Sequence, residues 1–394
     1  MNIAFTPEQK ALQLEVREYM ANLMTDTMRE EMKNPEYFEG GGPEFRRLMK
    51  QMGKDGWISL SWPKEYGGRE ASPIEQYIFT EEVMKAGFPY PFLTTEAIGP
   101  VLAEHGDEQI RKTVVQGILD GEVVIAIGYS EPDAGTDLAA LKTKAEQQAD
   151  GSWLINGQKI WTSLANFADY IWVAARTDPD AAKPHKGISM FLVPADNPGF
   201  SHTPIHTLGV RTNATYYQDL KLSDDWRVGE INKGWNLVTG QLNRERLSLV
   251  NHGPVFNLFD EVASWAAENN ANDGQRLIDK AWVRGNLAKV KTGLQALRLI
   301  CLKQAWAMET GTLTMEQASA AKVYGTEFFV EAYRLLLEIL GHNGLLQQDS
   351  PGAILKGKLE HRYRVGSILT FGGGCNEVQR EIIAGAGLWM PRGR

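Results

Sequence analysis

One acidic residue, Glu245, has the setting that a general base needs. It lies on an apolar stripe of helical spacing. The stripe consists of Trp235, Val238, Leu242 and Leu249. A carboxylate on a buried helix face loses hydration, which raises its pKa toward neutrality, and a base that works near pH 7 requires such a pKa. The same pattern also fits a partly buried Glu paired with Arg244 or Arg246, so the stripe alone leaves both interpretations open.

Three loops contain residues suited to a flat, polar ligand. Residues 127–137 follow a strand-like run and offer backbone N–H groups and small side chains. In residues 159–163, Trp161 stands beside Thr162 and Ser163, so that it could cover a ring while the hydroxyls bond its heteroatoms. Residues 371–377 carry three consecutive glycines, which allow close approach of backbone. The plainer alternatives are a surface turn, a core Trp at a strand end and an interhelix turn.

Several kinds of site lack their signature. The chain has no strand–GxGxxG–helix unit, no Walker A loop and no GxSxG elbow. His202 and His206 are four apart, but Pro204 lies between them, so we interpret them as strand or loop residues and expect no metal. Two cysteines, Cys301 and Cys375, rule out a disulfide framework and fit a reducing cytosol.

Composition narrows the class of protein further. The 394 residues are 43% hydrophobic and 23% charged, with a net charge of −8 and no basic cluster. We therefore expect neither nucleic acid nor a membrane surface as the main partner, although a small anionic ligand stays possible. The N-terminus lacks the features of a secretory signal, and no apolar run reaches the roughly 18 residues of a membrane helix. We expect a soluble, cytoplasmic protein.

The elements follow the order helices, sheet, helices. Thr6, Pro7 and Gln9 predict the capped start of a first helix. Further helices are predicted at residues 44–52, 74–85, 108–119, 234–249, 254–268, 275–310, 315–340 and 359–369. Short strands are predicted at residues 123–128, 153–157, 170–175, 188–193 and 216–222. This is an α+β fold with a helical domain at 1–121, a middle antiparallel β domain at 122–230 and a C-terminal helical bundle at 231–394.

Five motifs in this order and spacing resemble the acyl-CoA dehydrogenase family over essentially the whole chain. They are residues 62–68, 130–137, 156–163, 234–246 and 374–380. Residues 128–132 and 369–374 look most similar to the catalytic subunit of heteromeric actinobacterial members that act on CoA thioesters of sterol side chains. The resemblance implies a helical N-terminal domain, a middle β domain and a C-terminal four-helix bundle, with FAD bound between the last two domains and a neighbouring subunit.

The resemblance also assigns roles by position. Tyr129 and Ser130 would meet the pyrimidine edge of the flavin, Trp161 would flank its ring, and Ser163 would bond near N5. The remaining cofactor-binding residues would be Thr162, Gly374 and Asn376. The substrate-binding residues would be Thr136, Asn243, Arg246, Gly372 and Gly373.

The catalytic base departs from the common pattern of the family. Most members carry a Glu after the aromatic residue of the last motif, but here Gly372 follows Phe371. A minority that handle bulky acyl groups place the base on a helix, immediately before an Arg, and Glu245-Arg246 fits that position. Two lines of argument, the buried stripe and the resemblance, therefore select Glu245.

The resemblance then implies a reaction. The thioester carbonyl would accept hydrogen bonds from the Gly372 N–H and a flavin ribitol hydroxyl, which stabilises the developing enolate. Glu245 would remove the α proton while the β hydrogen leaves as hydride to flavin N5, giving a trans-2-enoyl-CoA. The missing side chain at Gly372 would leave room for a ring-bearing or branched acyl group, as in the β-oxidation of steroid side chains.

Two departures bear on assembly. Residues 275–287 lack the R-x-x-F-G run with which many homotetrameric members hold FAD, and Glu338 replaces a Gln near the expected pyrophosphate. We therefore expect an α2β2 heterotetramer with a second acyl-CoA dehydrogenase-like chain, in preference to a homotetramer, and an electron-transfer flavoprotein as electron acceptor. The alternatives are a flavin oxidase of the acyl-CoA or nitroalkane type, which uses oxygen, and a non-catalytic partner subunit.

Overall fold

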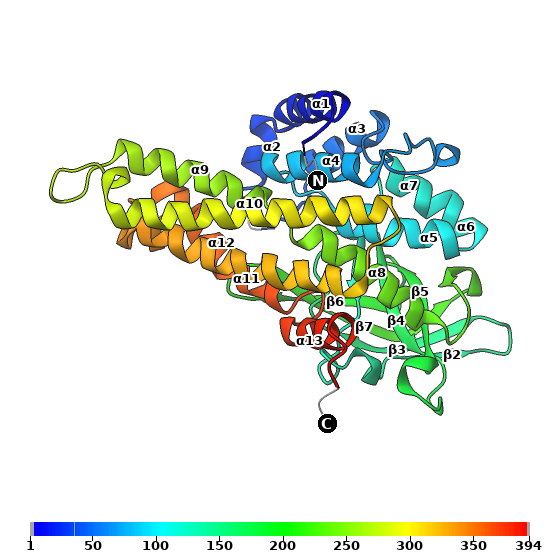
Figure 1. Ribbon diagram of the computed structural model, residues 1–394. Helices are drawn as coiled ribbons and strands as arrows, with labels where there is room; N and C mark the ends of the chain where they lie inside the picture. Colours follow the sequence, from blue (N-terminus) through cyan, green and yellow to red (C-terminus); the bar gives the residue numbers. More distant parts are fainter. Residues whose placement is uncertain (1–3, 35, 392–394) are drawn as a thin grey trace. The chain divides into compact units, whose positions relative to one another are not determined.

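The computed structural model describes residues 4–34 and 36–391, apart from the side chains of residues 243–249. Along the chain, helices come first, then a β-sheet, then helices again (Figure 1). These residues form two compact units, each described by itself below. The bundle unit comprises Met1–Asn22, Ser72–Phe88 and Arg246–Arg394. The sheet unit comprises Leu23–Ala71 and Pro89–Glu245.

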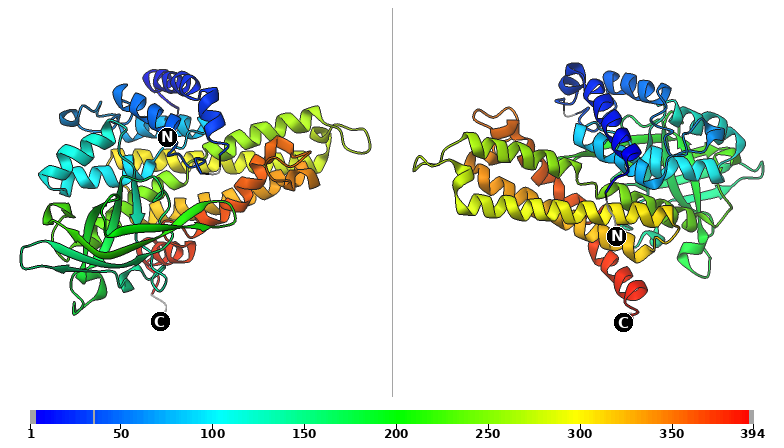
Figure 2. Two further views of the ribbon diagram at one scale, coloured as in Figure 1. Left: turned by 180° about the vertical axis from the view of Figure 1, so that it is seen from behind. Right: turned by 45° about the horizontal axis from the view of Figure 1, so that its top comes forward.

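The bundle unit is helical, and its apolar core is formed mainly by residues 250–340. Its helices are α1 (Pro7–Leu23), α4 (Pro73–Ala86), α9 (Gly253–Glu268), α10 (Ala281–Glu309), α11 (Met315–Leu340), α12 (Lys358–Gly366) and α13 (Asn376–Ile382). Helices α9, α10 and α11 lie side by side, and α12 packs on α11 (Figures 1 and 2). The buried residues of α10 recur every three or four positions: Val283, Leu287, Val290, Leu294 and Leu297. The expected C-terminal helical bundle is confirmed.

Two early helices, α1 and α4, belong to the bundle unit. Gln13 Nε2 and Arg17 Nε of α1 each donate to the Glu82 carboxylate of α4 at 2.9 Å. The predicted cap of the first helix is present, because Gln9 N–H donates to Thr6 Oγ1 at 3.2 Å. The division into units cuts the chain differently from the domain boundaries 1–121, 122–230 and 231–394, which stay a prediction.

The sheet unit combines short helices with an eight-stranded sheet. Its helices are α2 (Asp26–Glu31), α3 (Pro43–Lys54), α5 (Gly99–His105), α6 (Glu108–Ile110), α7 (Gln116–Leu119) and most of α8 (Gly234–Leu249). Its strands are β1 (Ile125–Gly128), β2 (Lys144–Gln147), β3 (Trp153–Lys159), β4 (Tyr170–Arg176), β5 (Ile188–Pro194), β6 (Phe200–His206), β7 (Arg211–Leu222) and β8 (Arg227–Val228). His202 and His206 lie on β6, within the strand-or-loop interpretation.

The sheet is mixed, whereas the sequence predicted an antiparallel domain. The strand order is β6-β7-β3-β2-β4-β5-β8, with β1 beside β4. β1 runs parallel to β4, with Ile125 opposite Tyr170, and β2 meets β4 in parallel where Lys144 faces Arg176; the other pairings are antiparallel. Parallel neighbours need a long connection, and β2 and β3 lie between β1 and β4 in the chain. Apolar periodicity predicts a strand but does not indicate its direction of pairing.

The central strands are buried on both faces. On β4, Trp172 belongs to one apolar cluster, while Ile171 and Val173 belong to the cluster on the other side. This alternation follows from the two-residue period of a strand. Continuous burial explains why β4 and β5 are largely apolar in the sequence and lack an alternation of polar and apolar residues.

A bulge at Gly157 extends β3 beyond its predicted end. The register with β7 shifts between Ile155 and Gly157, and a Cβ at Gly157 would come within 2.4 Å of the Thr143 hydroxyl. Only glycine fits here, so the strand passes through the Asn-Gly pair and continues to Lys159. Because β3 continues this far, Lys159 and the residues after it lie beside the loop that follows β1.

Candidate active site

The loops after β1 and β3 lie together in the sheet unit. The backbone N–H of Ile160 donates to the carbonyl of Ser130 at 2.8 Å. This bond joins two segments that the sequence assigned to one flat ligand: Tyr129 and Ser130 on one side, and Trp161 with its hydroxyl neighbours on the other. The structure therefore brings these predicted residues side by side.

A buried ion pair anchors both loops. Lys159 Nζ lies 2.8 Å from Glu131 Oε1 and donates to the Tyr129 carbonyl at 3.1 Å. Glu131 also accepts the backbone N–H groups of Lys142 and Thr143 at 2.6 and 2.8 Å. Burial lowers the pKa of Lys159 to about 8, while the Glu131 carboxylate opposes that shift. Lys159 is thus a cation at neutral pH, held by the loop that it supports.

The Tyr129 hydroxyl ties the same loop to helix α8. It donates to Gln241 Oε1 at 3.0 Å and accepts from Trp172 Nε1 at 2.8 Å. All three side chains are buried. Gln241 stands one helical turn before Glu245, so the Tyr129 hydroxyl links the first predicted ligand loop to the helix that carries the predicted base.

Trp161 is not a core residue, so the plainer interpretation of that position is wrong. Its side chain is 55% exposed, and its φ of 62° is a conformation that residues other than glycine rarely adopt. The next two residues are fixed against β7: Thr162 Oγ1 lies 3.2 Å from Thr215 Oγ1, and Ser163 Oγ donates to Thr212 Oγ1 at 3.2 Å. A large, exposed ring on a strained, anchored backbone is typical of a binding surface.

Thr136, Asn243 and Arg246 are the predicted substrate contacts outside the glycine loop, and they lie on a loop of the sheet unit and on α8. Thr136 is exposed on the loop between β1 and β2. The predicted base Glu245 and the predicted substrate contacts Asn243 and Arg246 lie on α8, but their side chains are outside the described part of the chain. The helix itself spans Gly234–Leu249, the range predicted from the sequence.

The glycine loop of residues 371–374 lies in the bundle unit, before α13. Phe371 is 59% exposed, and Gly373 and Gly374 have φ values of 66° and 96°, which glycine adopts without strain. The Gly372 N–H donates to the carbonyl of Ile368 at 2.7 Å. In this conformation, therefore, the N–H that the sequence assigned to the thioester carbonyl already has an acceptor.

Asn376, a predicted cofactor contact, is buried. Its Nδ2 donates to Thr326 Oγ1 and Glu327 Oε1, each at 3.1 Å, and its Oδ1 accepts from Lys322 Nζ at 2.7 Å. The side chain is thus bonded to α11, and a contact with a ligand would fall to its backbone. Glu338, expected to repel a pyrophosphate, forms an ion pair with Arg334 and accepts from Asn286, which weakens that repulsion.

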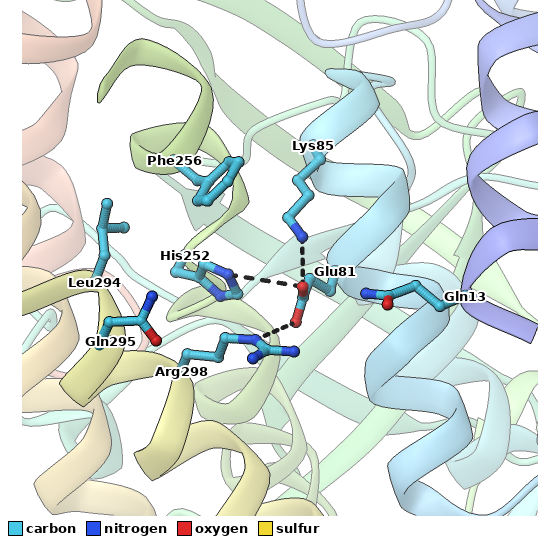
Figure 3. A pocket seen from close by; sticks show the side chains of 8 residues that line it. All are labelled: Gln13, Glu81, Lys85, His252, Phe256, Leu294, Gln295 and Arg298. Carbon is cyan, nitrogen blue, oxygen red and sulfur yellow. Dashed lines mark hydrogen bonds and ion pairs between the residues drawn. The ribbon is translucent and has the colours of Figure 1, made fainter. Parts of the chain in front are cut away.

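The bundle unit also contains a cavity of about 120 Å³ around Glu81 (Figure 3). Its lining residues are Gln13, Glu81, Lys85, His252, Phe256, Leu294, Gln295 and Arg298. The Glu81 carboxylate lies 2.5 Å from Lys85, 3.4 Å from Arg298 and 3.8 Å from His252. Burial lowers the pKa of His252 to about 4, so the imidazole is neutral at pH 7. Among the side chains that the structure describes, none of the predicted site residues lines this cavity, and its charges are satisfied by one another.

From the sequence, we assigned no individual role to four residues of these arrangements. Glu131 and Lys159 lie inside the predicted ligand loops, whereas Gln241 and Lys322 lie outside them. Lys159 had a usable signal, since a lysine between buried strand positions needs an acidic partner. Gln241 lies between Val238 and Leu242 on the apolar stripe and could have been recognised as a buried polar contact. In the described part of the chain, no group of three or more His, Cys, Asp or Glu could hold a metal ion. None of the described helices has the length and apolarity needed to cross a membrane.

Three family models together match nearly the whole chain. They are the acyl-CoA dehydrogenase N-terminal domain at residues 6–122, the middle domain at 126–222 and the C-terminal domain at 232–388. Among curated proteins, acyl-CoA dehydrogenase FadE26 of Mycobacterium tuberculosis is 47% identical over 399 residues, which cover 100% of this chain and 99% of the relative. Acyl-CoA dehydrogenase FadE29 of the same organism is 42% identical over 394 residues, with 100% and 99% covered.

Solved structures agree with this assignment. A chain of the ChsE4-ChsE5 complex from Mycobacterium tuberculosis superposes with a TM-score of 0.92 at 46% identity, with 100% of both chains covered. A chain of the Tcur3481-Tcur3483 steroid ACAD gives a TM-score of 0.91 at 43% identity, again over 100% of both chains.

Proposed function

We propose that this chain, which belongs to the acyl-CoA dehydrogenase family, is the catalytic chain of an enzyme that forms an α,β double bond in a bulky acyl-CoA. It is an oxidoreductase that acts on CH–CH bonds, and FAD is its cofactor. The observation that carries the proposal is the hydrogen bond between Tyr129 and Gln241, which joins the expected flavin loop to the helix of the expected base.

The residues of the sheet unit fit a flavin. An isoalloxazine ring needs one flat apolar neighbour and hydrogen-bonding groups at its edge. Trp161 presents an exposed indole, and Ser130 and Ser163 supply hydroxyls on two loops that are bonded together. Tyr129 would contribute through its backbone, because its hydroxyl bonds Gln241 and Trp172. Thr162, which is buried and bonded to β7, would hold the second loop in place. In the bundle unit, Gly374 and the backbone of Asn376 would meet the nucleotide part.

Glu245 is the proposed general base. Val238 and Gln241 are fully buried, and residues at i, i+3, i+4 and i+7 share one helix face. Glu245 lies seven positions after Val238 and four after Gln241, so the proposal places its carboxylate on that buried side, where lost hydration raises its pKa. There it would take the α proton of the acyl group. Arg246 and Asn243 would line the substrate channel.

The thioester carbonyl requires a hydrogen-bond donor, because negative charge develops on its oxygen as the proton leaves. In our proposal the Gly372 N–H exchanges its bond to Ile368 for one to this oxygen, and the adjacent Gly373 and Gly374 allow the necessary backbone rotation. The chemistry that FAD supplies when bound is acceptance of the hydrogen that leaves the β carbon as hydride. The product is a trans-2-enoyl-CoA.

A ring-bearing acyl group is the proposed substrate class. Residues 372–374 place no side chain in the loop that would face the acyl carbons, which leaves room for bulk. One similar structure is described as a steroid ACAD, and this supports a steroid side-chain thioester. Thr136 would contact the phosphate-bearing part of CoA.

The proposed assembly is an α2β2 heterotetramer with a second acyl-CoA dehydrogenase-like chain. One of the two similar structures is named as a ChsE4-ChsE5 complex, and the name of the other also gives two components, Tcur3481 and Tcur3483. We further propose an electron-transfer flavoprotein as acceptor and a cytoplasmic location, which suits the free thiols of Cys301 and Cys375.

The test is anaerobic flavin bleaching across a panel of acyl-CoAs. The proposal expects faster bleaching by a steroid side-chain thioester than by octanoyl-CoA, and clear preference for octanoyl-CoA would contradict the substrate class. Oxygen consumption in step with turnover would instead establish an oxidase. A purified chain that holds stoichiometric FAD but bleaches with no thioester, even with a partner chain present, would indicate a non-catalytic subunit.

A further inference from the structure

Lys322 is a fully buried cation beside the glycine loop. It projects from α11, and its ammonium group bonds to three acceptors of the bundle unit. Nζ lies 3.0 Å from the Thr370 carbonyl, 2.7 Å from the Gly374 carbonyl and 2.7 Å from Asn376 Oδ1. An ammonium has three N–H donors, so one donor is available for each acceptor.

The two carbonyl acceptors bracket residues 371–374. A trans peptide is planar, and its C=O and N–H point in opposite directions. Because the carbonyls of Thr370 and Gly374 point at Lys322, the N–H groups of Phe371 and Cys375 in the same peptides must point away from it. Lys322 thus fixes the orientation of the peptide planes at both ends of the loop.

The loop between these ends needs such a tether. Three consecutive glycines have more accessible backbone conformations than any other residues, and two of them, Gly373 and Gly374, stand at positive φ. Without Lys322, the carbonyls would lose a buried charged donor, and the loop would sample many arrangements.

We propose that Lys322 is a positioning residue, which holds both ends of the glycine loop so that its backbone meets the cofactor and the acyl thioester. This inference rests on the proposed function, which gives Gly374 to the cofactor and Gly372 to the thioester. The bonds from Lys322 go to the carbonyls at the two ends of residues 370–374, so they do not themselves prevent the Gly372 N–H from changing its acceptor.

Helix α11 supplies a matched control one turn earlier. Ser319 is also fully buried, and its Oγ donates to Gln379 Oε1 of α13 at 2.9 Å. Like Lys322, it ties α11 to the segment that follows the glycine loop, but it does not contact residues 370–374. A loss of general packing should therefore affect both positions, whereas loop positioning should depend on Lys322 alone.

The experiment compares the full chain, with its partner chain where one co-purifies, as wild type, Lys322→Met, Lys322→Arg and Ser319→Ala. The measurements are the dissociation constant for FAD, amide hydrogen exchange in residues 370–376, and the rate of anaerobic bleaching. For Lys322→Met we expect FAD affinity and bleaching each to fall at least about tenfold, with faster exchange in the loop, because buried charge-assisted hydrogen bonds are lost. Lys322→Arg should recover part of both losses, and Ser319→Ala should stay within about twofold of wild type.

Two results would overturn the inference: a folded Lys322→Met with wild-type affinity and loop exchange, or equal losses in Ser319→Ala. If Lys322→Met fails to fold, the further variant Lys322→Gln decides, because a folded Lys322→Gln, which lacks the charge, contradicts a positioning role if its FAD affinity and loop exchange equal those of wild type. Wild-type protein that binds FAD but oxidises no thioester would reject the proposed function, while the affinity and exchange measurements would still judge Lys322.

Discussion

Lys159 Nζ lies 2.8 Å from Glu131 Oε1, and neither side chain exposes more than 5% of its surface. The lysine also donates to the Tyr129 carbonyl, and the glutamate accepts two backbone N–H groups. One ion pair therefore organises the loop after β1 and the end of β3, the two segments assigned to the flavin.

Replacement of Lys159 should lower the free energy of unfolding. In Lys159→Met the Glu131 carboxylate stays buried without its cation, which typically costs about 3–5 kcal/mol of unfolding free energy. The control is Lys142→Met, which breaks an exposed pair with Asp133 and should cost at most about 1 kcal/mol. Urea denaturation measures both. Equal losses of unfolding free energy in the two variants would show that the buried ion pair stabilises the protein no more than the exposed pair does.

Tyr129→Phe should affect both stability and catalysis. The substitution removes the hydroxyl that Trp172 and Gln241 both contact inside the protein, at an expected cost of about 1–3 kcal/mol. Because Gln241 lies one turn before Glu245, the bleaching rate should fall as well. The control is Tyr324→Phe, because the hydrogen bond from the Tyr324 hydroxyl to the Gly293 carbonyl is long, at 3.5 Å, and exposed. Denaturation and stopped-flow bleaching test the two effects, and an unchanged bleaching rate would remove the proposed link to α8.

Trp161→Gly should separate stability from binding. Glycine tolerates the φ of 62°, so unfolding free energy should stay within about 1 kcal/mol of wild type, while the dissociation constant for FAD should rise at least about tenfold through loss of the indole. Glu70→Gly, at an exposed position with φ of 53°, is the matched control and should leave FAD affinity unchanged. Equal affinities in both variants would mean that Trp161 does not cover the cofactor.

Stability should fall as the pH is lowered from 6.5 toward 4. The folded-state pKa of His252 is about 4, below its ordinary 6.5, so the unfolded chain binds a proton that the folded chain rejects. The contribution of His252 to the unfolding free energy is fully present above pH 6.5. Below that pH it falls by up to about 1.4 kcal/mol for each pH unit. Burial also lowers the pKa of His361 to about 4, which adds a second slope of the same sign.

Denaturation curves between pH 7.5 and 5 check this dependence. His252→Gln should remove about half of the slope that the two histidines produce. Burial alone would raise the pKa of Glu81, but the neighbouring His252 and the Lys85 and Arg298 cations leave that pKa below its usual value, so this carboxyl group titrates below the window. His202→Gln, on the exposed face of β6, is the control. If the unfolding free energy of His252→Gln depends on pH as steeply as that of wild type, His252 is not the group that titrates.

The sequence predicted the elements whose signal is local. The apolar stripe around Val238 marked α8 with its observed ends, and the cap at Thr6 marked α1. Motif order identified the loops at Tyr129 and Trp161, which the structure joins through Ile160. The family was therefore recognisable, and the comparisons confirm it.

Features that depend on distant residues were missed. Lys322 lies about fifty positions before the carbonyls that it bonds, and nothing near it in the sequence indicates burial. Strand β2 has only Ala145 buried, too weak a pattern to predict. The sequence assigned the Gly372 N–H to a ligand, because a motif indicates only which residue occupies a position. That this N–H donates to the Ile368 carbonyl depends on how the loop folds, which the motif does not indicate.

The central claim is that Glu245 removes the α proton, and the rate of anaerobic flavin bleaching in Glu245→Gln tests it most directly. The substitution keeps size and hydrogen bonding but removes the proton acceptor, so we expect normal FAD content and a rate loss of at least about 10³-fold. Glu230→Gln, an exposed residue before α8, should bleach at the wild-type rate. A Glu245→Gln enzyme that bleaches within about tenfold of wild type would contradict the account, because another group would then be the base.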